Sequence, residues 1–118
     1  MSDELSTQEE NAVEPIAAEL DPDHIYVKLS KPIKSYGDEV SVIKMRLPTG
    51  GDGIRIGNPV DFYPMTDPPI VRFNMPLVQA MVARLANIPS GSIEKMASND
   101  LMSCAWKLVP FFLPNLGT

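Results

Sequence analysis

The stretch HIYVKLSKPIKSYGDEVSVIKMRL, residues 24–47, decides the fold that the sequence predicts. Its first part alternates strictly between apolar and polar residues, which is typical of a half-buried β-strand. A turn at residues 35–38 then leads into a second run rich in β-branched residues, from Val40 to Leu47. The two runs predict an antiparallel β-hairpin, whose first strand turns one apolar set toward the core. That inward set is Ile25, Val27 and Leu29.

The second run changes its apolar parity between Val42 and Ile43. A one-residue change of parity is typical of a β-bulge, because an extra residue reverses which face the following side chains occupy. We therefore expect a bulge at this point of the second strand. Beyond it the inward set is Ile43, Met45 and Leu47.

The next segment, residues 48–76, is rich in Gly, Pro, Asp and Asn and predicts a long irregular connection. Such a connection is either a binding loop or an ordered, packed loop. Its glycines do not form a phosphate-binding loop, since a dinucleotide-binding fingerprint would need a glycine at Ile56. A Walker A loop would need Lys and then Ser or Thr where the chain has Gly57-Asn58-Pro59. We interpret the glycines as turn residues.

Helical spacing begins after Asn74, which is a candidate N-cap, and an apolar stripe continues to Leu85. This first helix is expected to end before Pro89, because the residue before a proline avoids the helical conformation. A short second helix is predicted to start at Ser92.

A third helix is predicted with Ser98 or Asn99 as its cap. Pro110 lacks the N–H that an α-helix needs, so we expect the helix to kink or stop there. Strands followed by helices predict the α+β class. The expected architecture is an N-terminal β-hairpin followed by about three short helices, preceded by a disordered acidic tail.

The 118 residues fit one small domain, and their net charge of −5 divides unevenly. Residues 1–23 carry eight Asp and Glu residues and no Lys or Arg, while the remainder carries ten basic and seven acidic residues, which gives −8 and +3. We expect residues 1–23 to be a disordered acidic tail and residues 24–118 to be a single domain. The basic residues are scattered and are not interleaved with aromatic residues, which argues against a nucleic-acid partner.

The chain offers little material for chemistry. His24 is the only histidine and Cys104 the only cysteine, so neither a histidine metal cluster nor an intrachain disulfide can form. Cys104 lies in a helical apolar pattern, which favours a buried side chain over a nucleophile. The acidic residues of the irregular segment match no calcium loop and are explained by turns. They are Asp52, Asp61 and Asp67. We expect no catalytic residues, no metal and no cofactor.

The composition also predicts the cellular compartment of the protein and whether it has a membrane partner. A lone cysteine fits a reducing compartment, and no apolar run is long enough to span a bilayer. We therefore expect a soluble, intracellular protein without a membrane partner.

The most distinctive surface candidate is the apolar run near the carboxyl end of the chain. It predicts either a plug for the core or a docking patch for a partner protein, because aromatic side chains serve both purposes. The predicted partner-binding residues are Trp106, Phe111, Phe112 and Leu113. We favour a mixed case, in which one phenylalanine packs inward and the other serves self-association or partner docking.

The order of these features resembles the tail assembly chaperones of Mu-like and related tailed bacteriophages. The resemblance covers roughly His24 to Leu113. It is carried by a strand ending Leu29-Ser30-Lys31-Pro32-Ile33, a second ending Met45-Arg46-Leu47-Pro48-Thr49, the turn Gly51-Asp52, the helix Met81-Val82-Ala83-Arg84-Leu85-Ala86, then Ile88-Pro89, Asn99-Asp100 and the segment from Trp106 to Leu113.

The resemblance implies a non-enzymatic protein of virion assembly that acts in the cytoplasm of the bacterial host. It implies binding to the tape measure protein, which is kept soluble while the tail tube polymerises around it. Other tail proteins and a longer form of the chain, made by ribosomal slippage, are further partners that the family suggests. Self-association is a separate expectation that rests on the apolar run. The alternative function is a structural component of the phage tail. The family supplies no catalytic residues.

Overall fold

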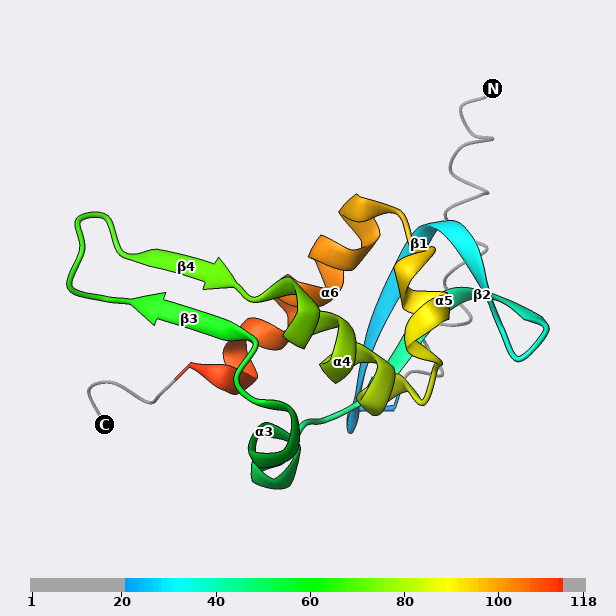
Figure 1. Cartoon of the computed structure of the whole chain (residues 1–118), viewed down its shortest axis with the longest axis horizontal. Helices are drawn as coiled ribbons and strands as arrows, with labels where there is room; N and C mark the ends of the chain where they lie inside the picture. Colours follow the sequence, from blue (N-terminus) through cyan, green and yellow to red (C-terminus); the bar gives the residue numbers. More distant parts are fainter. Residues whose placement is uncertain (1–20, 114–118) are drawn as a thin grey trace.

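The computed structural model describes residues 21–113, and these residues form an α+β fold, as predicted. Two β-hairpins and four helices follow one another within the described part of the chain (Figure 1). Their bounds are β1 His24–Ser35, β2 Asp38–Arg46, α3 Gly50–Ile56, β3 Val60–Tyr63, β4 Ile70–Phe73, α4 Met75–Ala86, α5 Ser90–Glu94 and α6 Ser98–Phe112. The predicted acidic tail lies outside the described residues up to residue 20.

The strands β1 and β2 form the hairpin that the alternation predicts. Ile25 pairs with Met45 and Val27 with Ile43, and none of these four side chains is more than 8% exposed. The turn between the strands has positive φ at Tyr36 (53°) and at Gly37 (86°). Two consecutive residues of positive φ are the backbone that two-residue hairpin turns favour, so the turn fixes the register.

The bulge prediction is wrong in its position. Lys28 pairs with Val42, but the next pair is Ile33 with Val40, so the extra residues lie in β1 and not between Val42 and Ile43 of β2. The physical reason is Asp100, a buried residue of α6, whose carboxylate accepts hydrogen bonds from this part of β1. The donors are the Ser30 N–H at 2.9 and 3.0 Å, the Ser30 hydroxyl at 3.0 Å and the Lys31 N–H at 3.3 Å.

The segment after β2 is more regular than predicted, because it begins with the helix α3. Thr49 is its N-cap residue, and the Thr49 N–H donates to Asp52 Oδ2 at 2.8 Å. This capping box outweighs the poor helix propensity of three glycines. Gly57 ends the helix with φ at 105°, a conformation that only glycine adopts without strain.

A second hairpin follows, and we call residues 60–73 the arm. Val60 pairs with Phe73 and Phe62 with Val71, so one face of the arm is apolar. The arm extends away from the helices (Figure 1). No strands were predicted in this segment, because each strand has only four residues and the tip is rich in proline.

The helix α4 confirms its prediction closely. Asn74 is the N-cap, and its Oδ1 accepts a hydrogen bond from the Leu77 N–H at 3.3 Å. The helix ends at Ala86, before Pro89, and Asn87 closes it in the left-handed conformation. Its buried residues are Val78, Met81, Val82 and Leu85.

The remaining helices depart from prediction at their ends. α5 begins at Ser90 rather than Ser92, and the N-cap of α6 is Ala97 rather than Ser98 or Asn99. α6 also passes through Pro110 and continues to Phe112. Pro110 is exposed, so water can reach the backbone carbonyl that loses its helical partner, and the helix survives.

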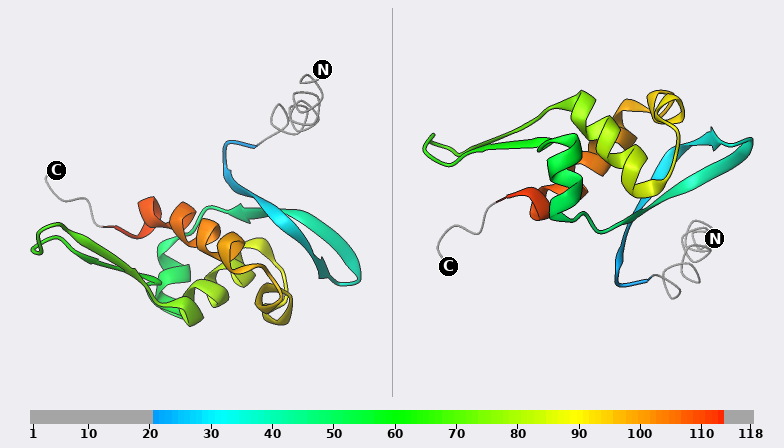
Figure 2. Two further views of the ribbon diagram at one scale, coloured as in Figure 1. Left: turned by 90° about the horizontal axis from the view of Figure 1, so that it is seen from above. Right: turned by 60° about the horizontal axis from the view of Figure 1, so that its bottom comes forward.

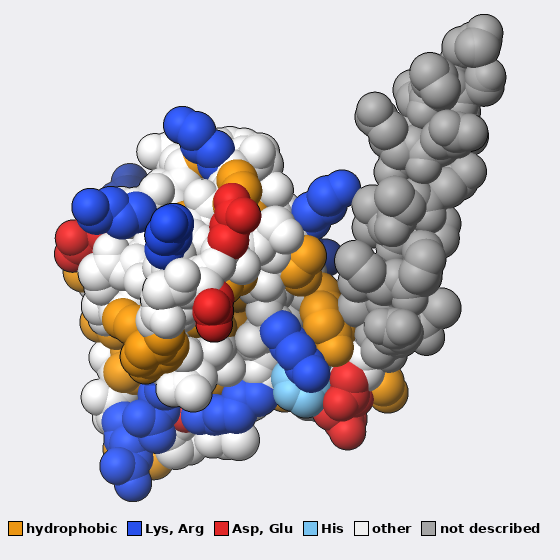
Figure 3. All heavy atoms as spheres, turned by 90° about the vertical axis from the view of Figure 1, so that its right-hand side faces the viewer, with side chains coloured by type: hydrophobic (Ala, Val, Ile, Leu, Met, Phe, Trp, Pro, Cys, Tyr) orange, Lys and Arg blue, Asp and Glu red, His pale blue; other side chains and the backbone are white. Residues whose placement is uncertain are grey.

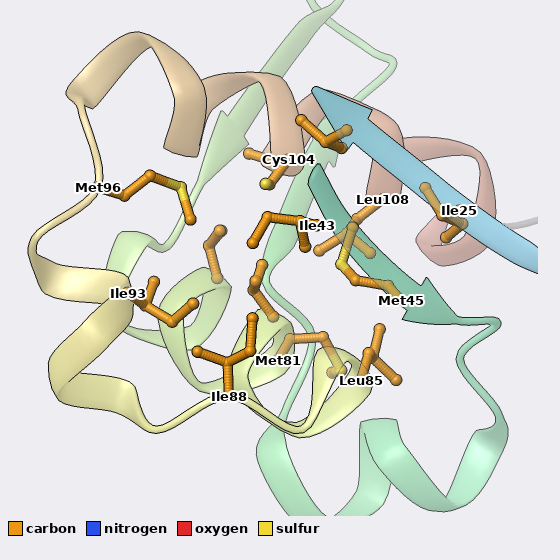
Figure 4. Close-up of a cluster of buried hydrophobic side chains, with 14 of the residues drawn as sticks. Ile25, Ile43, Met45, Met81, Leu85, Ile88, Ile93, Met96, Cys104 and Leu108 are labelled. Atoms are coloured by element: carbon orange, nitrogen blue, oxygen red, sulfur yellow. The ribbon is translucent and has the colours of Figure 1, made fainter. Parts of the chain in front are cut away.

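All four helices and the arm lie on one side of the β1–β2 hairpin (Figure 2). The buried side chains between the hairpin and α4, α5 and α6 make one core (Figure 4). The core residues are Ile25, Val27, Leu29, Ile33, Ile43, Met45, Val78, Met81, Val82, Leu85, Ile88, Ile93, Met96, Cys104, Ala105 and Leu108. Leu47, which was predicted inward, is only partly buried against it.

Candidate functional site

The structure separates the four predicted binding residues into two places. Trp106 is 55% exposed and Phe111 44% exposed, whereas Phe112 and Leu113 are partly buried. Phe111, Phe112 and Leu113 come together at one hollow, because α6 continues past Pro110. Trp106 does not line that hollow and lies one turn and a half earlier on α6.

The hollow lies between the end of α6 and the start of α3 and has a volume of about 620 Å³. Gly50 and Gly53 of α3 line it, and a Cβ at either glycine would have no neighbour within 4 Å. The hollow is therefore open on the α3 side. Its remaining lining residues are Pro48, Thr49, Ile54 and Asn58.

Ile54 was missed by the sequence analysis. Its side chain is 87% exposed on α3, and it faces the hollow that Phe111 also lines. The only signal for it was an aliphatic residue within a glycine-rich stretch, which was interpreted as a turn. An isoleucine this exposed lowers the solubility of the chain unless it meets another apolar surface.

Trp106 belongs to a second apolar region, which includes the arm. Its ring packs edge-on against Phe73 of β4, with 5.1 Å between the ring centroids. The arm adds exposed apolar side chains of its own. They are Tyr63 at 45%, Met65 at 93% and Ile70 at 37% exposed. Arg72 lies over the ring of Tyr63 at 5.9 Å, which leaves a cation beside the apolar surface.

Large exposed hydrophobic side chains are concentrated on α3, the arm and α6. Eight such side chains occur among the described residues, and seven of them lie on these three elements. The eighth, Tyr36, lies in the β1–β2 turn. We call the surface formed by α3, the arm and the exposed side of α6 the apolar end.

A buried carboxylate holds α3 in place. Asp52 is 1% exposed, and it accepts hydrogen bonds from Arg46 of β2 at 2.8 and 2.7 Å and from Arg84 of α4 at 2.6 Å. The Arg46 hydrogen bonds, supported by Arg84 and the Thr49 N–H, hold the pKa of the Asp52 carboxyl well below its usual range. One wall of the hollow is thus tied to the core by an ionised group.

The surroundings of the residues that were considered as nucleophiles or metal ligands explain them as structural residues. Cys104 is fully buried, and its burial raises the pKa of its thiol to about 12, so the thiol stays protonated. His24 Nδ1 lies 3.1 Å from the Asp21 carboxylate at the start of β1. Among residues 21–113 no three His, Cys, Asp or Glu side chains are grouped so that they could hold a metal ion. No helix in that range is long and apolar enough to cross a membrane.

One comparison with known proteins gave a match. The family model described as "Phage tail assembly chaperone proteins, E, or 41 or 14" matches residues 26–113, which include all of the described strands and helices except the first two residues of β1. Searches of curated proteins and of solved structures returned no significant match.

Proposed function

The chain belongs to the phage tail assembly chaperone family, and from that premise we propose that it binds the tape measure protein and keeps it soluble during tail tube assembly. The family assigns the protein to tail assembly in the host cell. Our proposal adds the partner and the surface that meets it. The observation that carries it is the apolar end.

The apolar end has the property that such a partner requires. A long helical protein that is not yet enclosed by its tube exposes apolar side chains, and a chaperone must cover them with apolar surface of its own. Most apolar side chains of the described residues are buried in or packed against the core, but the exposed ones on α3, the arm and α6 remain accessible to a partner. We therefore assign the partner contact to this end.

Within the apolar end, the two phenylalanines have different roles. Phe112 packs against the core, whereas Phe111 is 44% exposed and lines the hollow together with Ile54. Phe111 is the side chain that a partner helix can reach, and Phe112 keeps the end of α6 packed against the core. Exposed aromatic residues beside a hollow are typical centres of protein–protein binding energy.

Coexpression with the tape measure protein of the same phage tests this assignment. Phe111→Ser is expected to keep the circular dichroism spectrum of the parent protein and to lower the soluble fraction of the tape measure protein. Tyr36→Asn is the matched control, because Tyr36 is 75% exposed at a site outside the apolar end and asparagine tolerates its positive φ. Unchanged solubility with Phe111→Ser, or an equal loss with Tyr36→Asn, contradicts the assignment.

Phe112→Ser separates the two phenylalanines. It removes an apolar side chain from the edge of the core, so we expect a lower thermal midpoint. If Phe112→Ser leaves the midpoint unchanged, the division of roles between the two phenylalanines is wrong.

The composition of purified virions tests the function itself. A chaperone acts during assembly, so we expect mass spectrometry to find the chain strongly depleted from virions relative to the tube subunit. A fixed, stoichiometric amount in the virion would instead indicate a structural component of the tail.

A further inference from the structure

The outer face of the β1–β2 hairpin is covered by none of the described elements. The helices pack against the inner face, so the side chains between the buried ones point away from the core. On this outer face Tyr26 pairs with Lys44, and Lys28 with Val42. The face therefore presents two amines beside one aromatic and one aliphatic side chain. Figure 3 shows the right-hand side of the view in Figure 1, where Lys, Arg and hydrophobic side chains lie next to one another.

Within residues 21–113 the ion pairs leave these two amines unused. Arg46, on the same strand as Lys44, forms an ion pair with Asp52, and His24 Nδ1 lies 3.1 Å from the Asp21 carboxylate. Lys28 and Lys44 make no ion pair within 4 Å with any of the described carboxylates, and the charge of Lys44 acts only at longer range on the Asp21 carboxylate. The part of the outer face formed by Tyr26, Lys28, Val42 and Lys44 thus carries two positive charges beside apolar side chains. It fits an acidic polypeptide that also carries apolar side chains.

The residues before β1 direct the chain toward this face. The Asp21 N–H donates to the hydroxyl of Tyr26 at 3.0 Å, and the Asp21 carbonyl accepts from the His24 N–H at 3.1 Å. The Asp21 carboxylate also lies 3.1 Å from His24 Nδ1. These contacts place Asp21 on the Tyr26 side of the hairpin, so the residues that precede it start from the outer face and not from the helical side.

The sequence before Asp21 contains the negative charges that would complement the two amines of the outer face. Residues 1–20 contain six Asp and Glu residues and no Lys or Arg. Val13, Ile16 and Leu20 also recur at intervals of three and four residues, with Glu14 and Glu19 among them. Twenty residues reach about 66 Å when extended and about 30 Å as a helix, while the Tyr26–Lys44 and Lys28–Val42 pairs lie about 7 Å apart along β1. The segment is therefore long enough to cover both pairs in either form.

We propose that the acidic segment formed by residues 1–20 docks on the outer face of the β1–β2 hairpin of its own chain. Its carboxylates neutralise Lys28 and Lys44, and its apolar side chains cover Tyr26 and Val42. Pairs of this kind at a surface are individually weak and sensitive to salt, so the docking is reversible. The acidic segment closes this face to other acidic chains and leaves the apolar end as the open binding surface.

A spin label on the full-length chain tests the docking. Ser6→Cys introduces a site for the label, and the native Cys104 does not compete because it is buried and its thiol pKa is raised to about 12. Paramagnetic broadening of backbone amide signals then reports which part of the body lies near residue 6. We expect broadening concentrated on the outer-face residues of β1 and β2.

Two charge-reversal variants distinguish docking from simple nearness along the chain. Lys28→Glu with Lys44→Glu is expected to reduce the broadening several-fold, and so is about 1 M salt, where the Debye length is about 3 Å. Lys95→Glu with Lys107→Glu makes the same charge change at exposed positions outside the hairpin and is expected to leave the broadening intact. Equal broadening in both variants, or broadening spread evenly over the body, overturns the proposal.

A mixed sample identifies whose segment occupies the face. Spin-labelled chains without isotope are combined with isotope-labelled chains without a spin label. We expect no broadening in this mixture. Broadening on the outer face would show that the segment of a second copy docks there, and it would overturn the assignment to the same chain.

Discussion

Asp52→Asn is the substitution that best tests how α3, and with it one wall of the hollow, is held. Asparagine keeps the size of the side chain but removes its charge and turns one acceptor into a donor. Wild-type Asp52 accepts three hydrogen bonds from Arg46 and Arg84, and two more from the N–H and hydroxyl of Thr49. In the variant an amide N–H₂ faces a guanidinium, so at least one pair of donors is opposed.

The size of the destabilisation depends on how much hydrogen-bond energy Arg46 and Arg84 lose in the variant. Hydrogen bonds to charged groups contribute about 1.5 to 3 kcal/mol each. The side chains of Arg46 and Arg84 are 42% and 37% exposed, so water replaces part of what is lost, and a simple sum overstates the cost. We expect a loss of about 3 kcal/mol in the free energy of unfolding. For a domain of this size that corresponds to a thermal midpoint about 12 to 24 °C lower.

The dependence on pH adds a second, independent signature. The pKa of Asp52 is lower in the folded than in the unfolded chain, so its stabilisation is fully present above the unfolded pKa of about 3.9 and is lost as pH falls further. The difference between wild type and Asp52→Asn should therefore be constant above about pH 5 and shrink below about pH 4. Urea denaturation at a series of pH values measures both quantities.

The control is Asp61→Asn, because Asp61 is exposed on the arm. Its expected effect is within about 0.5 kcal/mol. Equal losses for the two variants, or a difference between wild type and Asp52→Asn that grows on acidification, would refute the view that an ionised Asp52 anchors α3.

Three further predictions concern the core and its contacts. Val27→Asp places an unpaired charge in the core and should cost several kcal/mol in urea denaturation, while Lys28→Asp on the outer face should be mild; equal losses would mean that the register is wrong. Asp100→Ala leaves the N–H groups of Ser30 and Lys31 without their acceptor, so amide hydrogen exchange should accelerate there and not at the β1–β2 turn; unchanged exchange would mean that the carboxylate does not hold the bulge. Cys104 should react with a thiol reagent at neutral pH only in denaturant, as mass spectrometry can show, and rapid labelling of the native chain would contradict its place in the core.

The sequence predicted best those elements whose signals are local. The alternation around Val27 and the N-cap at Asn74 each involve residues within a few positions of one another, and both are confirmed. Helix α4 has its apolar stripe, its cap and its terminating proline within sixteen residues, so little else can override them.

The wrong predictions have causes that are distant in the sequence or that compete locally. The position of the bulge depends on Asp100, about seventy residues from Ser30, and no pattern within β2 could reveal it. α3 was missed because its glycines suggest a turn, whereas the capping contact between Thr49 and Asp52 stabilises a helix. Because α3 was not predicted, the sequence also could not show that Ile54 of α3 lies beside Phe111 at the hollow.

The contact between Asp100 and the bulge of β1 also has a consequence for the order of events during synthesis. Translation proceeds from the amino end, so β1 and β2 are made long before α6. The acceptor for the Ser30 and Lys31 amides, and the core residues Cys104 and Leu108, are synthesised only with α6, about seventy residues after this part of β1. Until α6 emerges from the ribosome, α4 and α5 can cover only part of the inner face of the hairpin. Folding of the body is therefore expected to be completed only once α6 has been made.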